Sequence, residues 1–222
     1  MRSRPMNAGP APVGWLAIAV GGAVGTGLRL LADATVPAPW ALVLVNALGS
    51  IALLGLLLGV WPRQPNAPAW LREGLGTGVL GAFTTLSAVS LAIVTPAAVP
   101  AAATAGPGML AAAVGAGAVG TLLRAGAMAA TARLRLPVGV LLANVLGSCI
   151  AGLALAGLLR GTLEPGLVVV LIAGACGGLT TFSTVIADTV RAWLSGRRWL
   201  AVAVLVANFA LGAGAAWIGL HA

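Results

Sequence analysis

The chain has 222 residues, of which 60% are hydrophobic and only 7% are charged, and its mean hydropathy is +1.07. A soluble domain carries about a quarter charged residues, so this composition predicts an integral membrane protein. The net charge of +8 comes from arginines that lie mostly between apolar segments, where they mark one side of a membrane, so we expect no nucleic-acid partner.

Reactive side chains are scarce in this chain. Cys149 and Cys176 lie inside apolar segments, which predicts neither a disulfide framework nor a metal site. The single histidine, His221, lies beside the last residue, and the chain has only four acidic residues. These counts leave no candidate metal cage and no Ser-His-Asp site, so we do not expect an enzyme.

Seven apolar segments are long enough for a transmembrane helix, which takes about 20 residues. Proline-rich joints separate several of them, and all seven tryptophans lie close to a segment end, where the ring prefers the headgroup region. We therefore expect an all-α, polytopic membrane protein. The predicted spans are 13–32, 40–61, 69–94, 108–130, 138–159, 167–194 and 200–220.

The first span has a second interpretation, as a signal peptide that follows Arg2 and Arg4 and is cleaved near Asp33. Its apolar run of about 20 residues is long for a signal core. It also contains a motif that is repeated later in the chain, so we favour a retained helix and a count of seven spans.

The arginines between the spans are distributed unevenly. With the N-terminus inside the cell, the outer loops contain only Arg160. The positive-inside rule therefore predicts a cytoplasmic N-terminus and an outer C-terminus in the plasma membrane, which is the inner membrane of a cell that has two. The arginines of the inner loops are Arg2, Arg4, Arg63, Arg72, Arg133, Arg135, Arg197 and Arg198.

Three short motifs occur twice in the same order. The copies lie 95, 98 and 96 residues apart, so the spacing of the motifs is kept as well as their sequence. Such self-similarity at a fixed period indicates an internal duplication. The paired segments are 22–29 with 117–124, 45–50 with 143–148, and 81–87 with 177–184.

The duplication predicts a first repeat at 1–95 with three spans, a linker at 96–107, and a second repeat at 108–222 with four spans. An odd number of crossings precedes the second repeat, so it enters the membrane from the opposite side. We therefore expect inverted repeats, an arrangement typical of transport proteins whose site lies at the repeat interface near the bilayer midplane.

The third motif places glycines and several hydroxyl residues in the middle of a span. Glycine lets the backbone leave the helix, and Ser and Thr hydroxyls can satisfy the groups that a break exposes. We therefore predict that both third spans are broken helices, which often bind ions at membrane depth. The alternative for such a segment is a packing face made of small residues.

Other polar residues within the spans have two interpretations each. The amides of Asn46 and Asn144 could donate to an anion or make helix–helix hydrogen bonds. Arg29 and Arg124 end the first span of each repeat, where we favour snorkelling to the interface over a role in attracting anions. The positive ring edge of Phe182 could face an anion, or the ring could simply pack.

The three motifs together resemble those of the Fluc/CrcB family of small fluoride channels. The resemblance rests on G-x-x-G-x-x-x-R, V-N-x-x-G-S and G-G-x-T-T-F-S-T, and it covers nearly the whole chain, twice over. Members of that family are four-helix subunits that assemble as antiparallel dimers with two pores. The resemblance therefore implies a whole channel, an internal pseudo-dimer, in one chain.

The resemblance also implies the site residues. In the family, the breaks of the third spans meet at the dimer centre and their carbonyls hold a structural sodium ion. A hard cation such as sodium prefers oxygen ligands. The implied sodium ligands are Gly81, Thr84, Gly177 and Thr180. The implied ion pathway contains Asn46, Thr85, Asn144, Thr181, Phe182 and Ser183.

The chain departs from the family pattern in two ways. Three of the four positions expected to carry pore-lining phenylalanines are Leu86, Val89 and Val185 instead. The first repeat also lacks a fourth helix, which keeps the number of preceding spans odd and so preserves the inversion. We therefore expect at least one degraded pore, and unequal contributions of Phe182 and the two asparagines to fluoride passage.

These observations favour a channel for passive fluoride export across a lipid bilayer, and they leave open whether two chains associate further. A non-conducting structural member of the same fold is the main alternative. An inverted-repeat carrier of a small solute is a third hypothesis. It is disfavoured because no carboxylate lies mid-span in both halves to couple transport to protons.

The arginine asymmetry generates a topological prediction. Single cysteines in the 131–135 loop should react only with membrane-permeant reagents in intact cells, whereas cysteines at 95–107 or at the C-terminus should react with impermeant reagents. Labelling of both termini from the same side would contradict the seven-span, inverted arrangement.

Overall fold

The structure is a computed structural model that describes residues 10–59, 67–95, 105–134 and 136–222. Every secondary-structure element in these ranges is helical, and seven helical spans are long and apolar enough to cross a membrane. The predicted count of seven spans is therefore confirmed, and the protein is a multi-pass membrane protein. The spans are Pro12–Thr35, Trp40–Leu57, Ala69–Val94, Pro107–Ala130, Val138–Leu159, Pro165–Leu194 and Arg198–His221.

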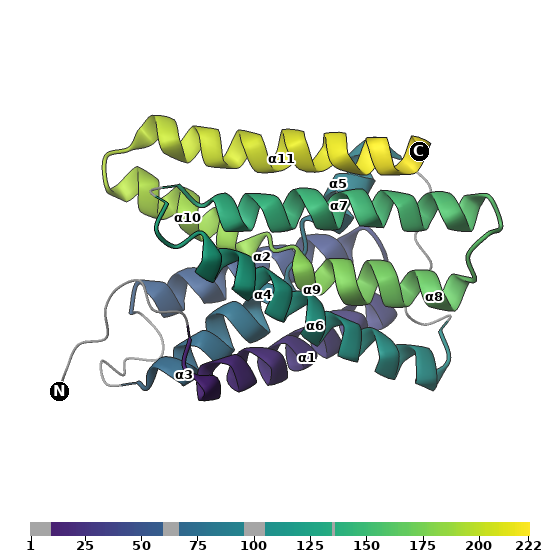
Figure 1. Ribbon diagram of the computed structural model, residues 1–222, viewed down its shortest axis with the longest axis horizontal. Helices are drawn as coiled ribbons and strands as arrows, with labels where there is room; N and C mark the ends of the chain where they lie inside the picture. Colours follow the sequence, from purple (N-terminus) through teal and green to yellow (C-terminus); the bar gives the residue numbers. More distant parts are fainter. Residues whose placement is uncertain (1–9, 60–66, 96–104, 135) are drawn as a thin grey trace.

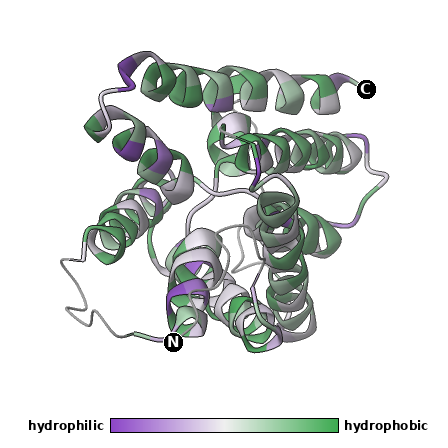
Figure 2. Cartoon of the chain, turned by 60° about the vertical axis from the view of Figure 1, so that its left-hand side comes forward, coloured by the Kyte–Doolittle hydropathy of each residue, from purple (hydrophilic) through white to green (hydrophobic). Residues whose placement is uncertain are grey.

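Half of the observed bounds coincide with the predicted ones, and the others differ by one to four residues. The second span ends as a helix at Leu57, and its predicted end at Trp61 lies outside the described residues, as do positions 96–104 of the linker. Hydrophobic residues predominate along the helices (Figure 2), and many large ones are exposed, such as Ile51, which is 68% exposed. Lipid is the solvent for these faces, so their exposure is expected.

The first two spans of each repeat are single helices. These are α1 (Pro12–Thr35) and α2 (Trp40–Leu57) in the first repeat, and α6 (Pro107–Ala130) and α7 (Val138–Leu159) in the second. Figure 1 shows α1 running from left to right and α6 from right to left. Corresponding helices of the two repeats therefore run in opposite directions.

The two first helices cross at glycines related by the repeat. A Cβ at Gly22 would lie 2.7 Å from the hydroxyl of Thr121, and Gly117 faces Thr26 in the same way. Any larger residue at these positions would push the helices apart. The paired G-A-V-G-T motifs of the sequence therefore form the contact between α1 and α6.

The third span of each repeat is built from four segments. In the first repeat they are α3 (Ala69–Arg72), the π-helical η1 (Glu73–Leu80), α4 (Gly81–Phe83) and α5 (Ser87–Val94). In the second they are α8 (Pro165–Val169), the π-helical η3 (Val170–Cys176), α9 (Gly177–Leu179) and α10 (Ser183–Leu194).

Both third spans are broken where the sequence predicted. Thr84 is extended with φ −96° and ψ 152°, and Thr180 is extended with φ −90° and ψ 158°. The helix resumes at Ser87 in one span and at Ser183 in the other. Each break thus separates an α4 or α9 half-helix from the α5 or α10 half that follows.

The last helix, α11 (Arg198–His221), completes the second repeat and packs along α7 and α10. Gly152 of α7 and Gly219 of α11 let the two backbones approach closely. After its break, α5 crosses to the second repeat and packs on α7 and α11, while α10 packs on α2. In the described part of the chain, no helix covers α2 in the way that α11 covers α7.

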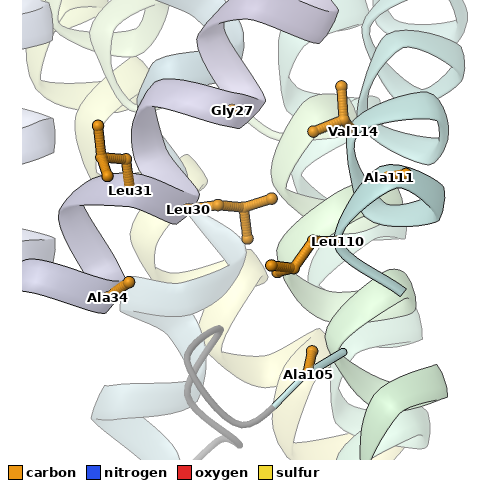
Figure 3. A pocket seen from close by; sticks show the side chains of 8 residues that line it. All are labelled: Gly27, Leu30, Leu31, Ala34, Ala105, Leu110, Ala111 and Val114. Carbon is orange, nitrogen blue, oxygen red and sulfur yellow. The ribbon is translucent and has the colours of Figure 1, made fainter. Parts of the chain in front are cut away.

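An apolar cavity of about 370 Å³ lies between the end of α1 and the start of α6. Figure 3 shows Leu30 of α1 and Leu110 of α6 pointing toward each other across it. All eight of its lining residues are apolar, so this cavity suits hydrocarbon rather than an ion. The candidate ion site lies elsewhere, at the helix breaks.

The close approach of α6 to the second broken span can be tested with Gly120→Ala. The new methyl group would meet the carbonyl oxygen of Ala175, a backbone atom that cannot swing aside as a side chain can. Overpacking of this kind costs about 1–3 kcal/mol, so the melting temperature of the purified protein in detergent should fall. Gly115→Ala, on the same helix but with open space around its Cβ, is the control and should leave the melting temperature unchanged.

Candidate functional site

The two helix breaks meet at a cluster of buried hydroxyl groups near the centre of the molecule. The Oγ1 atom of Thr84 lies 2.9 Å from the Oγ of Ser183 and 3.3 Å from the Oγ1 of Thr181. The equivalent contact on the other side joins Thr85 and Thr180, whose Oγ1 atoms are 3.2 Å apart. All five residues are at most 3% exposed. The predicted proximity of the two breaks is therefore confirmed.

Each break uses a threonine of the other repeat to cap the half-helix that follows. The Oγ1 of Thr180 accepts hydrogen bonds from the backbone N–H groups of Leu86 and Ser87, at 3.3 and 3.2 Å. The Oγ1 of Thr84 accepts one from the N–H of Ser183, at 3.1 Å. The first N–H groups of a helix have no partner within the helix. The threonine hydroxyls supply these N–H groups with a hydrogen-bond acceptor from across the repeat interface.

The asparagines of the second spans hold the backbone of the breaks. The Oδ1 of Asn46 accepts the N–H of Thr85 at 2.9 Å, and its Nδ2 donates to the carbonyl of the same residue at 3.1 Å. Asn144 makes the same pair of bonds with Thr181, at 2.8 and 3.3 Å. Each amide thus pairs with both backbone groups of one threonine, as a neighbouring strand would.

Asn144 has a further partner on the last helix. Its Nδ2 donates to the Oδ1 of Asn208 at 2.7 Å, so both of its N–H groups are used. Asn46 has no such partner among the described residues, because the first repeat has no fourth helix. Asn208 was not predicted as a site residue, although a lone asparagine in the middle of an apolar span is a signal that could have found it.

The two arginines of the first spans are buried, which corrects the expectation that they snorkel to the interface. Arg29 is 3% exposed and Arg124 is 0% exposed. The Nε of Arg29 donates to the carbonyl of Ala82 at 3.2 Å, and its Nη2 donates to the carbonyl of Ala173 in the other repeat. Two backbone carbonyls accept from its Nε and Nη2 atoms, which offsets part of the cost of burying the guanidinium.

Arg124 makes the repeat-related bonds. Its Nε donates to the carbonyl of Gly178 at 3.2 Å, and its Nη2 donates to that of Thr77 in the first repeat at 2.9 Å. The guanidinium lies over Gly81, where a Cβ would be 2.5 Å from the Nη1 atom. This explains one of the glycines in the third motif: its missing side chain leaves the space that the arginine fills.

A second polar contact lies one helical turn beyond the asparagine pair. The Oγ of Ser148 on α7 donates to the Oγ of Ser90 on α5 at 3.1 Å, beneath Gly212 of α11. Both serines are at most 1% exposed. We call Asn144, Asn208, Ser148 and Ser90 the polar ladder. In the first repeat the residue equivalent to Ser148 is Ser50, whose buried Oγ has no hydrogen-bond partner.

Comparison with known families decides what these paired motifs are. The model of the CrcB-like proteins, described as Camphor Resistance (CrcB), matches residues 16–116 and again 109–220. The chain belongs to the CrcB-like family. The two matches cover most of the chain, and each contains one copy of all three motifs.

Individual CrcB-like relatives align with about one third of the chain. "Fluoride-specific ion channel FluC 2" of Thermobifida fusca is 48% identical over 77 residues, which are 32% of this chain and 56% of the relative. The FluC proteins of Renibacterium salmoninarum and Bordetella avium are 42% and 41% identical, over 38% and 37% of this chain and 67% and 68% of their own lengths. No solved structure is significantly similar to the chain.

Two phenylalanines of this CrcB-like chain pack together beside α11. Phe182 meets Phe209 of α11 edge to face, with ring centroids 5.8 Å apart. Phe209 directly follows Asn208, so Phe182 lies on the side of Asn144 rather than of Asn46. Sequence reasoning missed Phe209 because the fourth helix has no second copy with which to compare it.

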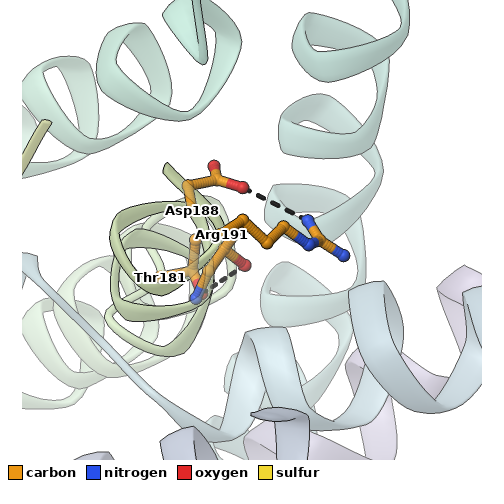
Figure 4. Close-up of polar contacts among 4 residues, drawn as sticks. Thr181, Asp188 and Arg191 are labelled. Atoms are coloured by element: carbon orange, nitrogen blue, oxygen red, sulfur yellow. Dashed lines mark hydrogen bonds and ion pairs between the residues drawn. The ribbon is translucent and has the colours of Figure 1, made fainter. Parts of the chain in front are cut away.

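At the end of the ladder on the side of the arginine-rich loops, an apolar cluster is followed by a polar cavity. Val140, Val185 and Val204 form a buried cluster next to the asparagine pair. Beyond them lies a cavity of about 450 Å³ that Asp188 and Arg191 help to line. Their side chains form an ion pair at 3.3 Å (Figure 4), as expected for residues three apart on a helix.

The hydrogen bonds of the breaks show whether the carbonyls of Gly81 and Gly177 are available to a cation. A continuous helix would direct the N–H of Thr85 to the carbonyl of Gly81, but this N–H donates to Asn46 instead. In the second repeat the N–H of Thr181 donates to Asn144 and not to the carbonyl of Gly177. Both glycine carbonyls have lost their helical donor, so they fit a cation that binds backbone oxygen.

Side chains are not placed to replace these carbonyls as metal ligands. In the ranges that the structure describes, no three His, Cys, Asp or Glu residues come together in a possible metal site. Any ion at the centre of this CrcB-like fold would therefore rest on backbone and hydroxyl oxygens.

The buried arginines give a stability prediction. Arg124→Lys should lower the melting temperature of the purified protein, because a lysine cannot reach two carbonyls with a planar fork. A hydrogen bond to a charged group contributes about 1.5–3 kcal/mol, so the loss of one should be easily measured by thermal unfolding in detergent. Arg160→Lys, at an exposed helix end, is the control, and an equal effect of the two variants would contradict the role given to Arg124.

Proposed function

We propose that this chain is a fluoride channel with a single anion pathway, which follows the polar ladder between α5, α7, α10 and α11. The observation that carries this proposal is the enclosure of the ladder by α11. The relatives described above bear the name of fluoride-specific channels, and the chain matches their family twice over. The proposed cargo is therefore fluoride, which crosses the plasma membrane passively out of the cell.

Enclosure supports one pathway over two. An ion cannot pass beside hydrocarbon, so a conducting path must have protein on all sides. Ser148 and Ser90 are covered by α11, whereas on α2 the buried Ser50 is followed by Ile51, which is 68% exposed, and no helix among the described residues covers that residue. The first-repeat side is therefore the degraded one, and the chain acts as an internal pseudo-dimer with one pore.

The ladder supplies the chemistry that a dehydrated fluoride needs. Amide N–H and hydroxyl groups can replace lost water contacts, and rotatable hydroxyls can turn their protons toward an anion. The edge of Phe182 or Phe209 adds a positive ring margin near Asn208. The valine cluster at the inner end is a buried apolar segment that resists the entry of a hydrated ion, so the polar groups of the ladder must supply the favourable contacts.

A central sodium ion is part of the same proposal. The carbonyls of Gly81 and Gly177, together with the extended Thr84 and Thr180, would hold it between the repeats. By binding carbonyls of both breaks, it would stabilise the place where the two breaks meet. The residues that conduct fluoride are those of the polar ladder.

Fluoride efflux from liposomes that contain the purified protein tests the pathway. Ser148→Ala should reduce the efflux rate by roughly tenfold, the effect of losing a hydrogen bond to a charged species. Ser50→Ala, the repeat-related substitution on the other side, is the matched control and should leave the rate unchanged. Equal losses from the two variants would indicate two pores. Absence of efflux from the wild-type protein would favour a structural, non-conducting member, and efflux that requires a proton gradient would favour a carrier.

A further inference from the structure

Asn46 and Asn144 share a role that a place in the ion pathway does not explain, because only Asn144 belongs to the polar ladder. We infer that they are positioning residues for the central cation: each keeps a break open by holding the amide that would otherwise bond the ligand carbonyl. This rests on the sodium site proposed above, and it does not depend on which side of the molecule conducts fluoride.

The backbone amides of Thr84, Thr85 and Leu86, which follow Gly81 at the break, all donate elsewhere. The N–H of Thr84 donates to the carbonyl of Leu80 at 3.3 Å, and the N–H of Leu86 donates to the Oγ1 of Thr180 at 3.3 Å. Between them, the N–H of Thr85 is the natural partner of Gly81 in an α-helix. Asn46 alone diverts it, through its Oδ1 atom at 2.9 Å.

The second repeat shows the same arrangement independently. The N–H of Thr180 donates to the carbonyl of Cys176 at 2.8 Å. The N–H of Thr181 would close the next helical bond to Gly177, but it donates to the Oδ1 of Asn144 at 2.8 Å. Two asparagines on different helices thus leave the carbonyls of Gly81 and Gly177 without their helical donors.

Removal of the asparagine Oδ1 atom leaves the threonine N–H without its hydrogen-bond acceptor. A buried N–H without a partner costs about 1–3 kcal/mol. The amide can avoid this cost by turning back to the glycine carbonyl, which closes one more turn of helix. That carbonyl would then be shared with a protein donor, and its cation would lose a ligand.

Asn208 separates this role from a role in conduction. Its Oδ1 accepts the second N–H of Asn144 at 2.7 Å, and its Nδ2 donates to the carbonyl of Val204 at 2.8 Å. Asn208→Ala therefore alters the polar ladder while leaving both asparagine–threonine pairs intact. Asn144→Asp is the conservative variant, because a carboxylate still accepts the N–H of Thr181 but can no longer donate to the threonine carbonyl or to Asn208.

The experiment measures the melting temperature of the detergent-purified protein as NaCl replaces N-methyl-D-glucamine chloride at constant ionic strength. The wild-type protein should be stabilised by sodium with a defined midpoint concentration. In Asn46→Ala and Asn144→Ala, this midpoint should rise at least tenfold, whatever the melting temperature without sodium. In Asn208→Ala and Asn144→Asp, the midpoint should stay within a factor of two or three of wild type.

A sodium midpoint that is unchanged in both alanine variants would overturn the inference, and so would a wild-type protein that sodium does not stabilise. If the alanine variants fail to fold, Asn144→Asp decides, since loss of its sodium response would equally contradict the role of the Oδ1 atom. Fluoride efflux is measured on the same proteins. A wild-type chain that binds sodium but does not conduct would refute the channel and leave the asparagine role standing.

Discussion

A helix that breaks inside a membrane exposes backbone groups that water cannot reach, and each unsatisfied group costs several kcal/mol. This chain contains two such breaks, and side chains satisfy most of the N–H groups and some of the carbonyls that they expose. Threonine hydroxyls cap the new helix starts, asparagines hold the extended residues, and arginines bond the carbonyls left behind. Many of these partners come from the other repeat. Neither break is therefore self-sufficient, and the inverted pairing of the repeats is a condition for both.

The same arrangement sets the electrostatics of the centre. The half-helices α4 and α9 end there with their carbonyls, which carry partial negative charge, while α5 and α10 begin there with partial positive charge. Arg29 and Arg124 bond the carbonyl ends and place two buried positive charges close to the breaks. Their charge favours an anion nearby and opposes a cation, so a cation at the centre needs freely available carbonyl oxygens to bind at all.

Much of this architecture could be predicted from the sequence, because hydropathy sets the spans and glycine with hydroxyl residues marks a break that apolar residues could not support. The burial of Arg124 could not be predicted in this way. Its position at the end of a span suggested the interface, and only the folded structure brings the carbonyls of Thr77 and Gly178 within its reach. Asn208 and Phe209 were missed for a different reason. The duplication was the guide to functional positions, and they lie in the one helix that was not duplicated.

The crossing of the half-helices bears on how the chain is assembled during synthesis. The α5 half-helix packs on α7 and α11, which follow it in the chain, and α10 returns to pack on α2, which precedes it. A nascent chain that has inserted only its first three spans therefore lacks the helices on which α5 packs. The hydroxyls of its break also lack their threonine partners, which lie later in the chain. Insertion of each span and completion of the fold are thus separate events, and the second can finish only when the final helix has entered the bilayer.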